Sequence, residues 1–239
     1  LAQDEEAIPR GPGHDCPYLP GREARERAFL AEALEPGAYH RLMELGWRRS
    51  GRVLYRAACD GCAACEAIRV PVADFRPTRS QRRAWRRNAD VRVEVGRPAD
   101  SEDRHRLFAR YLESRHDGSM SGNFEEFSRF LCESPVDTLE MSYWLGETLV
   151  GVGIVDACPA SLSTVYFYFD PAQARRSLGV FSTLWEIDYA RRRSIPHYYL
   201  GYYVRDARTM RYKSQFCPHE RRQADGVWRR FEKDTEVGS

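Results

Sequence analysis

The chain has 239 residues, which is enough for one or two domains and for a hydrophobic core without disulfide bonds. Hydrophobic residues make up 42% and aromatic residues 12% of the chain, a content that excludes an intrinsically disordered protein. The formal net charge is +2, and the longest apolar stretch, residues 149–155, is far too short to span a bilayer, so we expect a cytoplasmic protein without a membrane partner.

Residues 1–90 are predicted to form a smaller N-terminal domain that contains a cluster of cysteines. Residues 22–43 have helical spacing in places. Residues 47–55 and 67–72 are predicted strands on either side of the cysteines.

Residues 91–239 show a more regular pattern and are predicted to form the catalytic domain. The expected elements are a strand at 91–95, helices at about 101–116 and 123–132, strands at 138–145, 149–157 and 164–169, a helix at 177–193 and a strand at 197–203. This order resembles the GNAT acyltransferase fold. We therefore expect an α+β protein, with a GNAT-like mixed sheet, flanking helices and the smaller N-terminal domain.

Four of the seven cysteines lie in the first third of the chain. Cys59, Cys62 and Cys65 are dense enough to bind a soft metal ion or an iron–sulfur cluster, with Cys16 as a candidate fourth thiolate. The alternative is that these are reduced cysteines packed at a turn, because the second separated Cys-x-x-Cys pair of zinc ribbons is absent. Both interpretations stay open at this point.

Residues 75–88 carry six arginines and no acidic residue. In a helix after Pro77, four arginines share one face at spacings of three to four residues. They are Arg79, Arg82, Arg83 and Arg86. A solvated helix face would usually carry interspersed Glu or Asp, whereas this stripe suits a sugar-phosphate backbone, so we predict a nucleic-acid interface.

The turn at residues 176–181, Arg-Ser-Leu-Gly-Val-Phe, opens the predicted helix at 177–193. Backbone N–H groups at such a turn can hold an anion, which makes Arg176 and Gly179 candidates for contact with a nucleic acid. Phe181 stands where the coenzyme A pattern of GNAT enzymes has Gly or Ala, and so argues against that ligand. Asp170 ends the preceding strand, where an acyl acceptor would approach in this fold.

Residues 197–203 and 210–218 combine tyrosines with Lys213, one of only two lysines in the chain.

The chain lacks the Gly-x-Ser-x-Gly, Walker A and His-Glu-x-x-His patterns, which argues against several classes of hydrolase.

Seven segments together resemble the arginyl/leucyl-tRNA–protein transferase family, and within it the bacterial leucyl-transferring branch. They are C-P-Y-L-P-G-R at 16–22, C-x-x-C-x-x-C-x-x-x-R at 59–69, F-x-P-x-R-S-Q-R-R at 75–83, Y-F-Y-F-D-P at 166–171, S-L-G-V-F-S at 177–182, Y-L-G-Y at 199–202 and M-x-Y-K at 210–213. The resemblance covers roughly residues 14–223, and the long motifs in the same order make it specific.

The resemblance implies transfer of leucine from leucyl-tRNA to proteins with an N-terminal Asp or Glu, which marks them for N-degron proteolysis. The acceptor's α-amine would attack the aminoacyl ester, which is already activated, so the transfer requires no cofactor. The reaction needs a group that holds or deprotonates the amine, donors for the developing oxyanion and a cation for the acidic side chain. The candidates are Asp170 for the amine, Tyr168 and Tyr202 for the oxyanion, and Arg76, Tyr212 and Lys213 for the acceptor's N-terminus.

Three alternatives remain at this stage. Arginine in place of leucine would keep the mechanism and change the donor. A GNAT acetyltransferase would depend on coenzyme A. A non-catalytic RNA-binding module with a cysteine-bound metal would bind tRNA and transfer nothing.

Overall fold

The computed structural model describes residues 7–115 and 122–232. The first elements are β1 (His14–Asp15), β2 (Glu23–Ala24), β3 (Glu26–Leu30), α1 (Ala38–Glu44), β4 (Arg48–Ser50) and β5 (Val53–Ala57). Strands β3, β5 and β4 form a small antiparallel sheet in that order, and β1 pairs with β2. These elements, together with α1, make up the N-terminal unit.

A sheet of eight strands forms the centre of the molecule, in the order β13-β12-β6-β11-β10-β9-β8-β7. The strands are β6 (Glu66–Pro71), β7 (Val91–Gly96), β8 (Thr138–Leu145), β9 (Thr148–Cys158), β10 (Ser161–Phe169), β11 (His197–Tyr203), β12 (His219–Arg222) and β13 (Trp228–Phe231). All neighbours are antiparallel except β10 and β11, which run parallel. A parallel pair needs a long crossover, which the helix between these two strands supplies.

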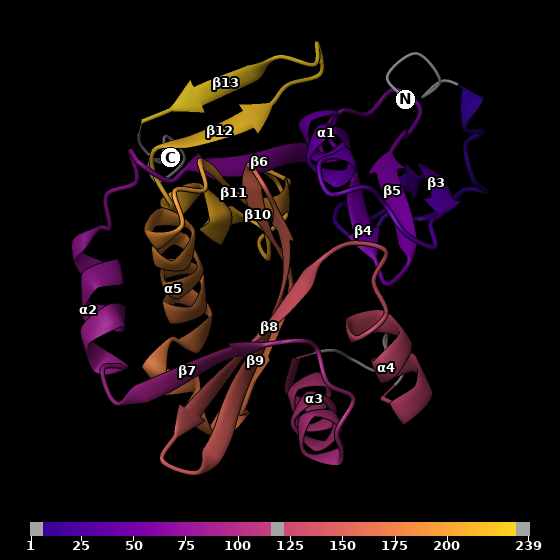
Figure 1. Ribbon diagram of the computed structural model, residues 1–239. Helices are drawn as coiled ribbons and strands as arrows, with labels where there is room; N and C mark the ends of the chain where they lie inside the picture. Colours follow the sequence, from indigo (N-terminus) through magenta and orange to yellow (C-terminus); the bar gives the residue numbers. More distant parts are fainter. Residues whose placement is uncertain (1–6, 116–121, 233–239) are drawn as a thin grey trace.

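Helices cover both faces of the sheet (Figure 1). Helices α2 (Arg79–Arg87) and α5 (Leu178–Arg192) lie on one face, and α3 (Glu102–Arg115), α4 (Phe124–Leu131) and the N-terminal unit lie on the other. Two short 3-10 helices, η2 (Pro171–Arg176) and η3 (Arg211–Gln215), follow β10 and β11. The predicted α+β class is confirmed, as is the predicted order of elements from β7 to β11.

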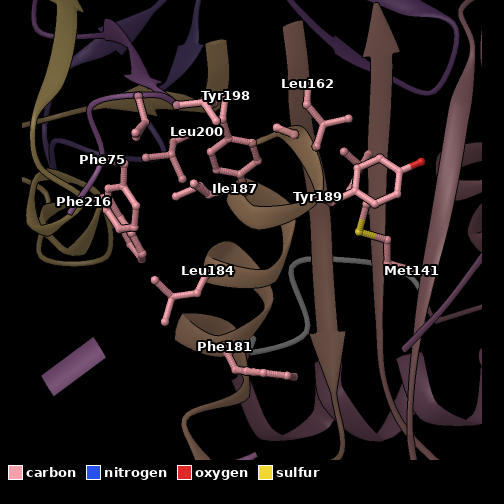
Figure 2. Close-up of a cluster of buried hydrophobic side chains, with 14 of the residues drawn as sticks. Phe75, Met141, Leu162, Phe181, Leu184, Ile187, Tyr189, Tyr198, Leu200 and Phe216 are labelled. Carbon is pink, nitrogen blue, oxygen red and sulfur yellow. The ribbon is translucent and has the colours of Figure 1, made fainter. Parts of the chain in front are cut away.

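The largest group of buried hydrophobic side chains lies between α5 and the sheet (Figure 2). Ile187 of α5 lies beside Tyr198 of β11, and Leu184 of α5 and Leu162 of β10 belong to the same cluster. Each fully buried side chain of this size stabilises the fold by about 1.5–3 kcal/mol. The crossover helix is therefore held firmly against the two parallel strands.

Strands β10 and β11 pair over only three residues each and then separate. The paired residues are 161–163 and 197–199, whereas β10 continues to Phe169 and β11 to Tyr203. Beyond the last pair, β11 has an irregularity between Tyr199 and Gly201, and Gly201 has a φ of 88°, a value that glycine adopts without strain. The separation leaves part of β11 without a partner strand on the β10 side.

Two predictions in the first 60 residues are wrong. Residues 22–43, whose spacing is helical in places, form β2 and β3, and only residues 38–44 are helical, because β3 pairs with β5 along its whole length. Residues 47–55 are two strands and not one, since the chain turns between β4 and β5 at Gly51, whose φ is 55°.

Strand β6 joins the two halves of the chain. It comes from the first 90 residues, yet it lies inside the large sheet between β11 and β12. The division at residue 90 stays a prediction, but residues from both sides of it share one sheet. No helix in the described ranges is long and apolar enough to cross a membrane.

Candidate active site

Two cations bind the backbone of β11 where it has separated from β10. Arg48 Nη2 donates to the carbonyl oxygen of Gly201 at 3.0 Å, and Lys213 Nζ donates to that of Tyr202 at 2.6 Å. Arg48 comes from β4 of the N-terminal unit and Lys213 from η3. The fold therefore brings three distant segments together at this point.

Lys213 is buried, with 8% of its surface exposed. Burial, and secondarily the nearby Arg48 charge, lowers the pKa of Lys213 from 10.5 to about 7. A large fraction of these amines is thus neutral at neutral pH and able to accept a proton, as catalytic lysines do.

Tyr202 lies on the side of β11 that faces the N-terminal unit. Its hydroxyl donates to Gly46 O at 2.7 Å and accepts from Ala57 N at 3.3 Å. Burial raises the pKa of Tyr202 above its usual value of 10. The hydroxyl predicted to stabilise an oxyanion is therefore bound to the backbone in this structure, while the Tyr202 backbone carbonyl contacts Lys213.

Asp170 lies at the carboxyl end of β10, as predicted. Its side chain caps η2 by accepting from Ala172 N at 3.0 Å, and Arg110 Nη2 lies 3.9 Å from Oδ2. Tyr168 is 1% exposed and packs its ring against Phe108 of α3. The structure therefore brings Asp170, but not the Tyr168 hydroxyl, to an accessible edge of β10; the catalytic roles of both stay predictions.

The remaining candidates for the acceptor's N-terminus are Tyr212 and Arg76. Tyr212, next to Lys213 on η3, is half exposed. Arg76 is exposed, and its guanidinium donates to the carbonyl oxygens of Ala73 and Phe75 at 2.9 Å.

Glu186 is a buried carboxyl group that the sequence interpretation missed. Oε1 accepts from Ser182 Oγ and Oε2 from the Tyr198 hydroxyl, both at 2.6 Å. Burial raises the pKa of Glu186 to about 7, even though hydrogen bonds from Ser182, Tyr198 and Thr164 lower it. A single Glu among the apolar residues of α5 is the signal that could have found it.

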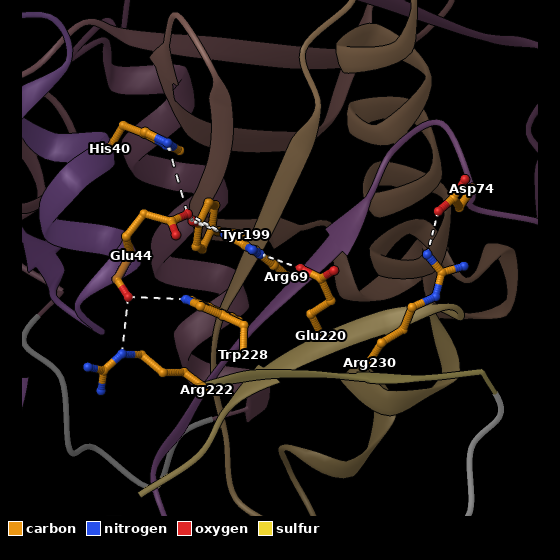
Figure 3. A network of polar contacts seen from close by, with 9 residues as sticks. All are labelled: His40, Glu44, Arg69, Asp74, Tyr199, Glu220, Arg222, Trp228 and Arg230. Carbon is orange, nitrogen blue, oxygen red and sulfur yellow. Dashed lines mark hydrogen bonds and ion pairs between the residues drawn. The ribbon is translucent and has the colours of Figure 1, made fainter. Parts of the chain in front are cut away.

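Arg69 ties the N-terminal unit to the strands that border the site (Figure 3). Its Nε donates to Glu220 at 2.7 Å, and its Nη1 donates to the Tyr199 hydroxyl at 3.0 Å and to Glu44 at the end of α1. Its guanidinium also lies 4.1 Å from the ring centre of Trp228. Charge-assisted bonds of this kind fix α1 relative to β6 and β11.

The predicted arginine helix is confirmed as α2, and it begins with a capping box formed by Thr78 and Gln81. Its inner face carries Gln81 and Ala84, and Trp85 packs against Phe181 of α5 with ring centres 5.5 Å apart. The four predicted arginines are all exposed on the outside. They are Arg79, Arg82, Arg83 and Arg86.

The predicted anion turn begins α5, with Ser177 in the left-handed conformation at a φ of 58°. Arg176, however, makes a bidentate ion pair with Asp90 at 2.8 and 3.0 Å and donates to Arg87 O. Gly179 lies within the first turn of the helix. Arg176 thus fastens the end of α2 to the start of α5 in this structure, and contact of Arg176 and Gly179 with tRNA stays a prediction.

The four candidate metal ligands lie near one another without forming a coordination site. Burial first, and then the neighbouring Cys59, Cys16 and Cys62, raises the pKa of Cys65 to about 12. Cys59 Sγ accepts from the backbone N–H of Arg25 at 3.4 Å. Within residues 7–115 and 122–232, no group of three or more His, Cys, Asp or Glu side chains is arranged to hold a metal ion. The residues do not fit a metal or cluster in this arrangement.

Comparisons with known proteins cover most of the chain. Residues 14–83 match the family described as "Arginine-tRNA-protein transferase, N terminus", and residues 103–223 match the corresponding C terminus. The chain is 42% identical over 226 residues to a protein from Marinobacter nauticus named aspartate/glutamate leucyltransferase, covering 93% of this chain and 95% of that protein. A protein of the same name from Thiobacillus denitrificans is 40% identical, with 92% of each chain covered.

Among solved structures, the C-terminal domain of a putative lysylphosphatidylglycerol synthetase from Agrobacterium fabrum has 12% identity and a TM-score of 0.47, over 75% of this chain and 55% of that one. A GCN5-related N-acetyltransferase from Kribbella flavida has 13% identity and a TM-score of 0.38, over 75% and 64%. Both likenesses are too distant to bear on activity. The two family matches and the identity along nearly the whole chain show instead that this protein belongs to the arginine-tRNA-protein transferase family.

Proposed function

We propose that this protein moves leucine from leucyl-tRNA to the N-terminal Asp or Glu of acceptor proteins in the cytoplasm. The observation that carries the proposal is the 42% identity, over 93% of the chain, to a relative named aspartate/glutamate leucyltransferase. The site at β11 supports it, because a buried lysine with a pKa of about 7 suits an acyl transfer that must remove a proton from an amine.

In the proposed reaction the acceptor's α-amine attacks the carbonyl carbon of the aminoacyl ester. The new C–N bond forms an amide, the C–O bond to the terminal ribose breaks, and the ribose hydroxyl leaves with a proton. An α-amine has a reference pKa of about 7.7–8.0, so much of it is protonated at neutral pH. The enzyme must therefore hold the amine and take up its proton.

Lys213 and Asp170 are proposed to share this task. The neutral Lys213 amine accepts the proton, and Asp170 holds the ammonium group before it is deprotonated. Asp170 ends β10 and Lys213 is bound to β11, so the two side chains come from either side of the strand separation. Tyr168, Tyr202, Tyr212 and Arg76 keep their predicted roles as parts of this proposal.

The arginine face of α2 is proposed to bind the tRNA backbone. Its four exposed arginines carry charge on the outside of the molecule, and the helix packs on α5, which begins at the candidate anion turn. The tRNA would then extend from α2 toward the separated strands.

Peptide aminoacylation tests the function. The purified protein is mixed with leucyl-tRNA or arginyl-tRNA and with peptides that begin with Asp, Glu or Lys, and the product mass is followed. Leucine on the Asp and Glu peptides alone is the expected result. Transfer of arginine to the same peptides would show that the donor is arginyl-tRNA. Acetylation of the peptides in the presence of acetyl-coenzyme A would show that the protein is an acetyltransferase. Binding of tRNA without any transfer would contradict an enzymatic role.

A further inference from the structure

Helix α2 is bonded to both of the short helices that border the candidate active site. Near its start, Gln81 Nε2 donates at 3.0 Å to the carbonyl oxygen of the last residue of η3, the helix that carries Lys213. Just after its last residue, Asn88 Nδ2 donates at 2.9 Å to the carbonyl oxygen of Arg176, which ends η2, the helix that Asp170 caps. The two ends of α2 are therefore fixed to the elements that position Lys213 and Asp170.

The arginine face of α2 carries positive charge that no acidic side chain neutralises within the part of the chain that the structure describes. Three of its exposed guanidinium groups have no ion-pair or hydrogen-bond partner there, and they belong to Arg79, Arg83 and Arg86. The fourth, that of Arg82, donates to the backbone carbonyl oxygen of Pro77. A face of this kind attracts a polyanion such as a nucleic acid.

Trp85 is an exposed aromatic side chain at the edge of this charged face. Its ring packs on Phe181 of α5, yet 39% of the Trp85 surface is open to solvent. Arg82 is three residues before Trp85 and four before Arg86, so it lies next to both on the surface of the helix. This arrangement suits a nucleotide, with its phosphate on an arginine and its base on the indole ring.

An exposed indole ring favours unpaired nucleotides over a duplex. The bases of a duplex are already stacked on one another, whereas unpaired bases are free to stack on aromatic side chains. A tRNA carries its aminoacyl ester on the last nucleotide of an unpaired 3′ end, and in the proposed reaction this ester must reach Lys213 and Asp170. Because α2 is bonded to the helices beside both residues, the part of a bound tRNA nearest α2 is this unpaired end.

We propose that Trp85 binds the unpaired 3′ end of tRNA by stacking on one of its bases. The inference rests on the proposed function and deepens it, since none of the roles proposed above uses Trp85. The arginines of α2 bind phosphates, which duplex and unpaired RNA share, and Trp85 distinguishes the unpaired end from the duplex.

The test measures the Kd of two forms of a leucine-accepting tRNA, one intact and one without its unpaired 3′ nucleotides. The ratio of the two Kd values reports recognition of the unpaired end, even if part of a protein sample is misfolded. In Trp85→Leu we expect the Kd for intact tRNA to rise about tenfold, because the stacking of one base is lost, while the Kd for truncated tRNA stays unchanged. Trp85→Phe should retain most of the affinity. Since Trp85 is uncharged, the slope of log K against log salt should not change in either variant.

Phe124→Leu is the matched control, since Phe124 is 41% exposed on α4, on the other face of the sheet, and both of its Kd values should equal those of the wild type. An equal rise of both Kd values in Trp85→Leu overturns the proposal, because Trp85 would then only support α2. Unchanged values in Trp85→Leu, or a wild type that binds both tRNAs equally well, also overturn it. If the wild type binds tRNA but transfers no leucine, the proposed function fails, while the ratio of Kd values still decides the role of Trp85.

Discussion

At the scale of single residues, the buried carboxyl of Glu186 makes stability depend on pH. Its pKa rises from 4.5 to about 7 in the folded protein, so the folded state holds this proton more tightly than the unfolded state. The contribution to stability is complete below about pH 4.5 and is lost as pH rises through about 7, at about 1.4 kcal/mol for each pH unit. Glu186→Gln cannot ionise, so its free energy of unfolding should fall less over this range than that of the wild type.

Denaturant unfolding at several pH values measures this difference. Asp188→Asn, which removes a surface pair with Arg192 on the same helix, is the control and should follow the wild-type curve. Parallel curves for Glu186→Gln and the wild type would show that the carboxyl ionises normally in the folded protein.

Lys213 gives a second prediction at this scale, on activity. Lys213→Met removes the proposed proton acceptor and should lower kcat by about 10²–10⁴-fold, with an unchanged Kd for leucyl-tRNA. In the wild type, kcat should rise with pH up to about 7, where the amine becomes neutral, and this rise should be absent in the variant. Single-turnover transfer measures both. A variant that keeps more than a tenth of the rate would remove Lys213 from the mechanism.

At the scale of elements, α2 is the proposed binding surface for tRNA. Arg82→Glu with Arg83→Glu should weaken tRNA binding and reduce the slope of log K against log salt by about one for each phosphate that the helix no longer binds. Arg106 and Arg129 are exposed arginines on α3 and α4, which lie on the other face of the sheet. The double variant Arg106→Glu with Arg129→Glu, which changes the net charge by the same amount, is therefore the control. Equal effects of the two double variants would mean that net charge matters and α2 does not.

Helices and strands that are determined by residues close together in the sequence could be predicted from it. Those that depend on contacts with other strands could not. Helix α2 was predictable because Pro77, the capping box and the arginine spacing are all local. Strand β12 was missed because its buried side chains are His219 and Arg221, and Arg221 is held over Phe231 with 3.7 Å to the ring centre. That contact exists only once β12 and β13 pair.

The same limit applies to the candidate site. Asp170 was found because the sequence pattern indicates that a strand ends at this residue. The lowered pKa of Lys213 depends on burial and on Arg48, which lies 165 residues earlier in the chain, so no local pattern reveals it.

At the scale of the whole molecule, one buried ion pair joins the N-terminal unit to the sheet. Arg49 Nη2 and Nε lie 2.6 and 2.7 Å from the two carboxylate oxygens of Asp156, and both side chains are fully buried. Arg49→Met leaves an unpaired buried carboxylate and should lower the free energy of unfolding by about 3–5 kcal/mol. Adding Asp156→Leu should restore part of this loss, since two apolar groups replace the pair.

Guanidinium unfolding curves check this expectation, with Arg106→Met, in an exposed pair, as the control. If Arg49→Met and the control lose equally little stability, the pair does not hold the two parts together.

The place of β6 between β11 and β12 has a consequence during synthesis. β6 leaves the ribosome about 130 residues before β11, and at cellular rates of translation this interval lasts roughly 10 s. Throughout that time an apolar strand that includes Ile68 and Val70 has neither of its neighbours. The nascent chain therefore exposes an apolar strand without its neighbouring strands during most of its synthesis. The yield of folded protein depends on whether β6 is protected from aggregation until the last quarter of the chain emerges.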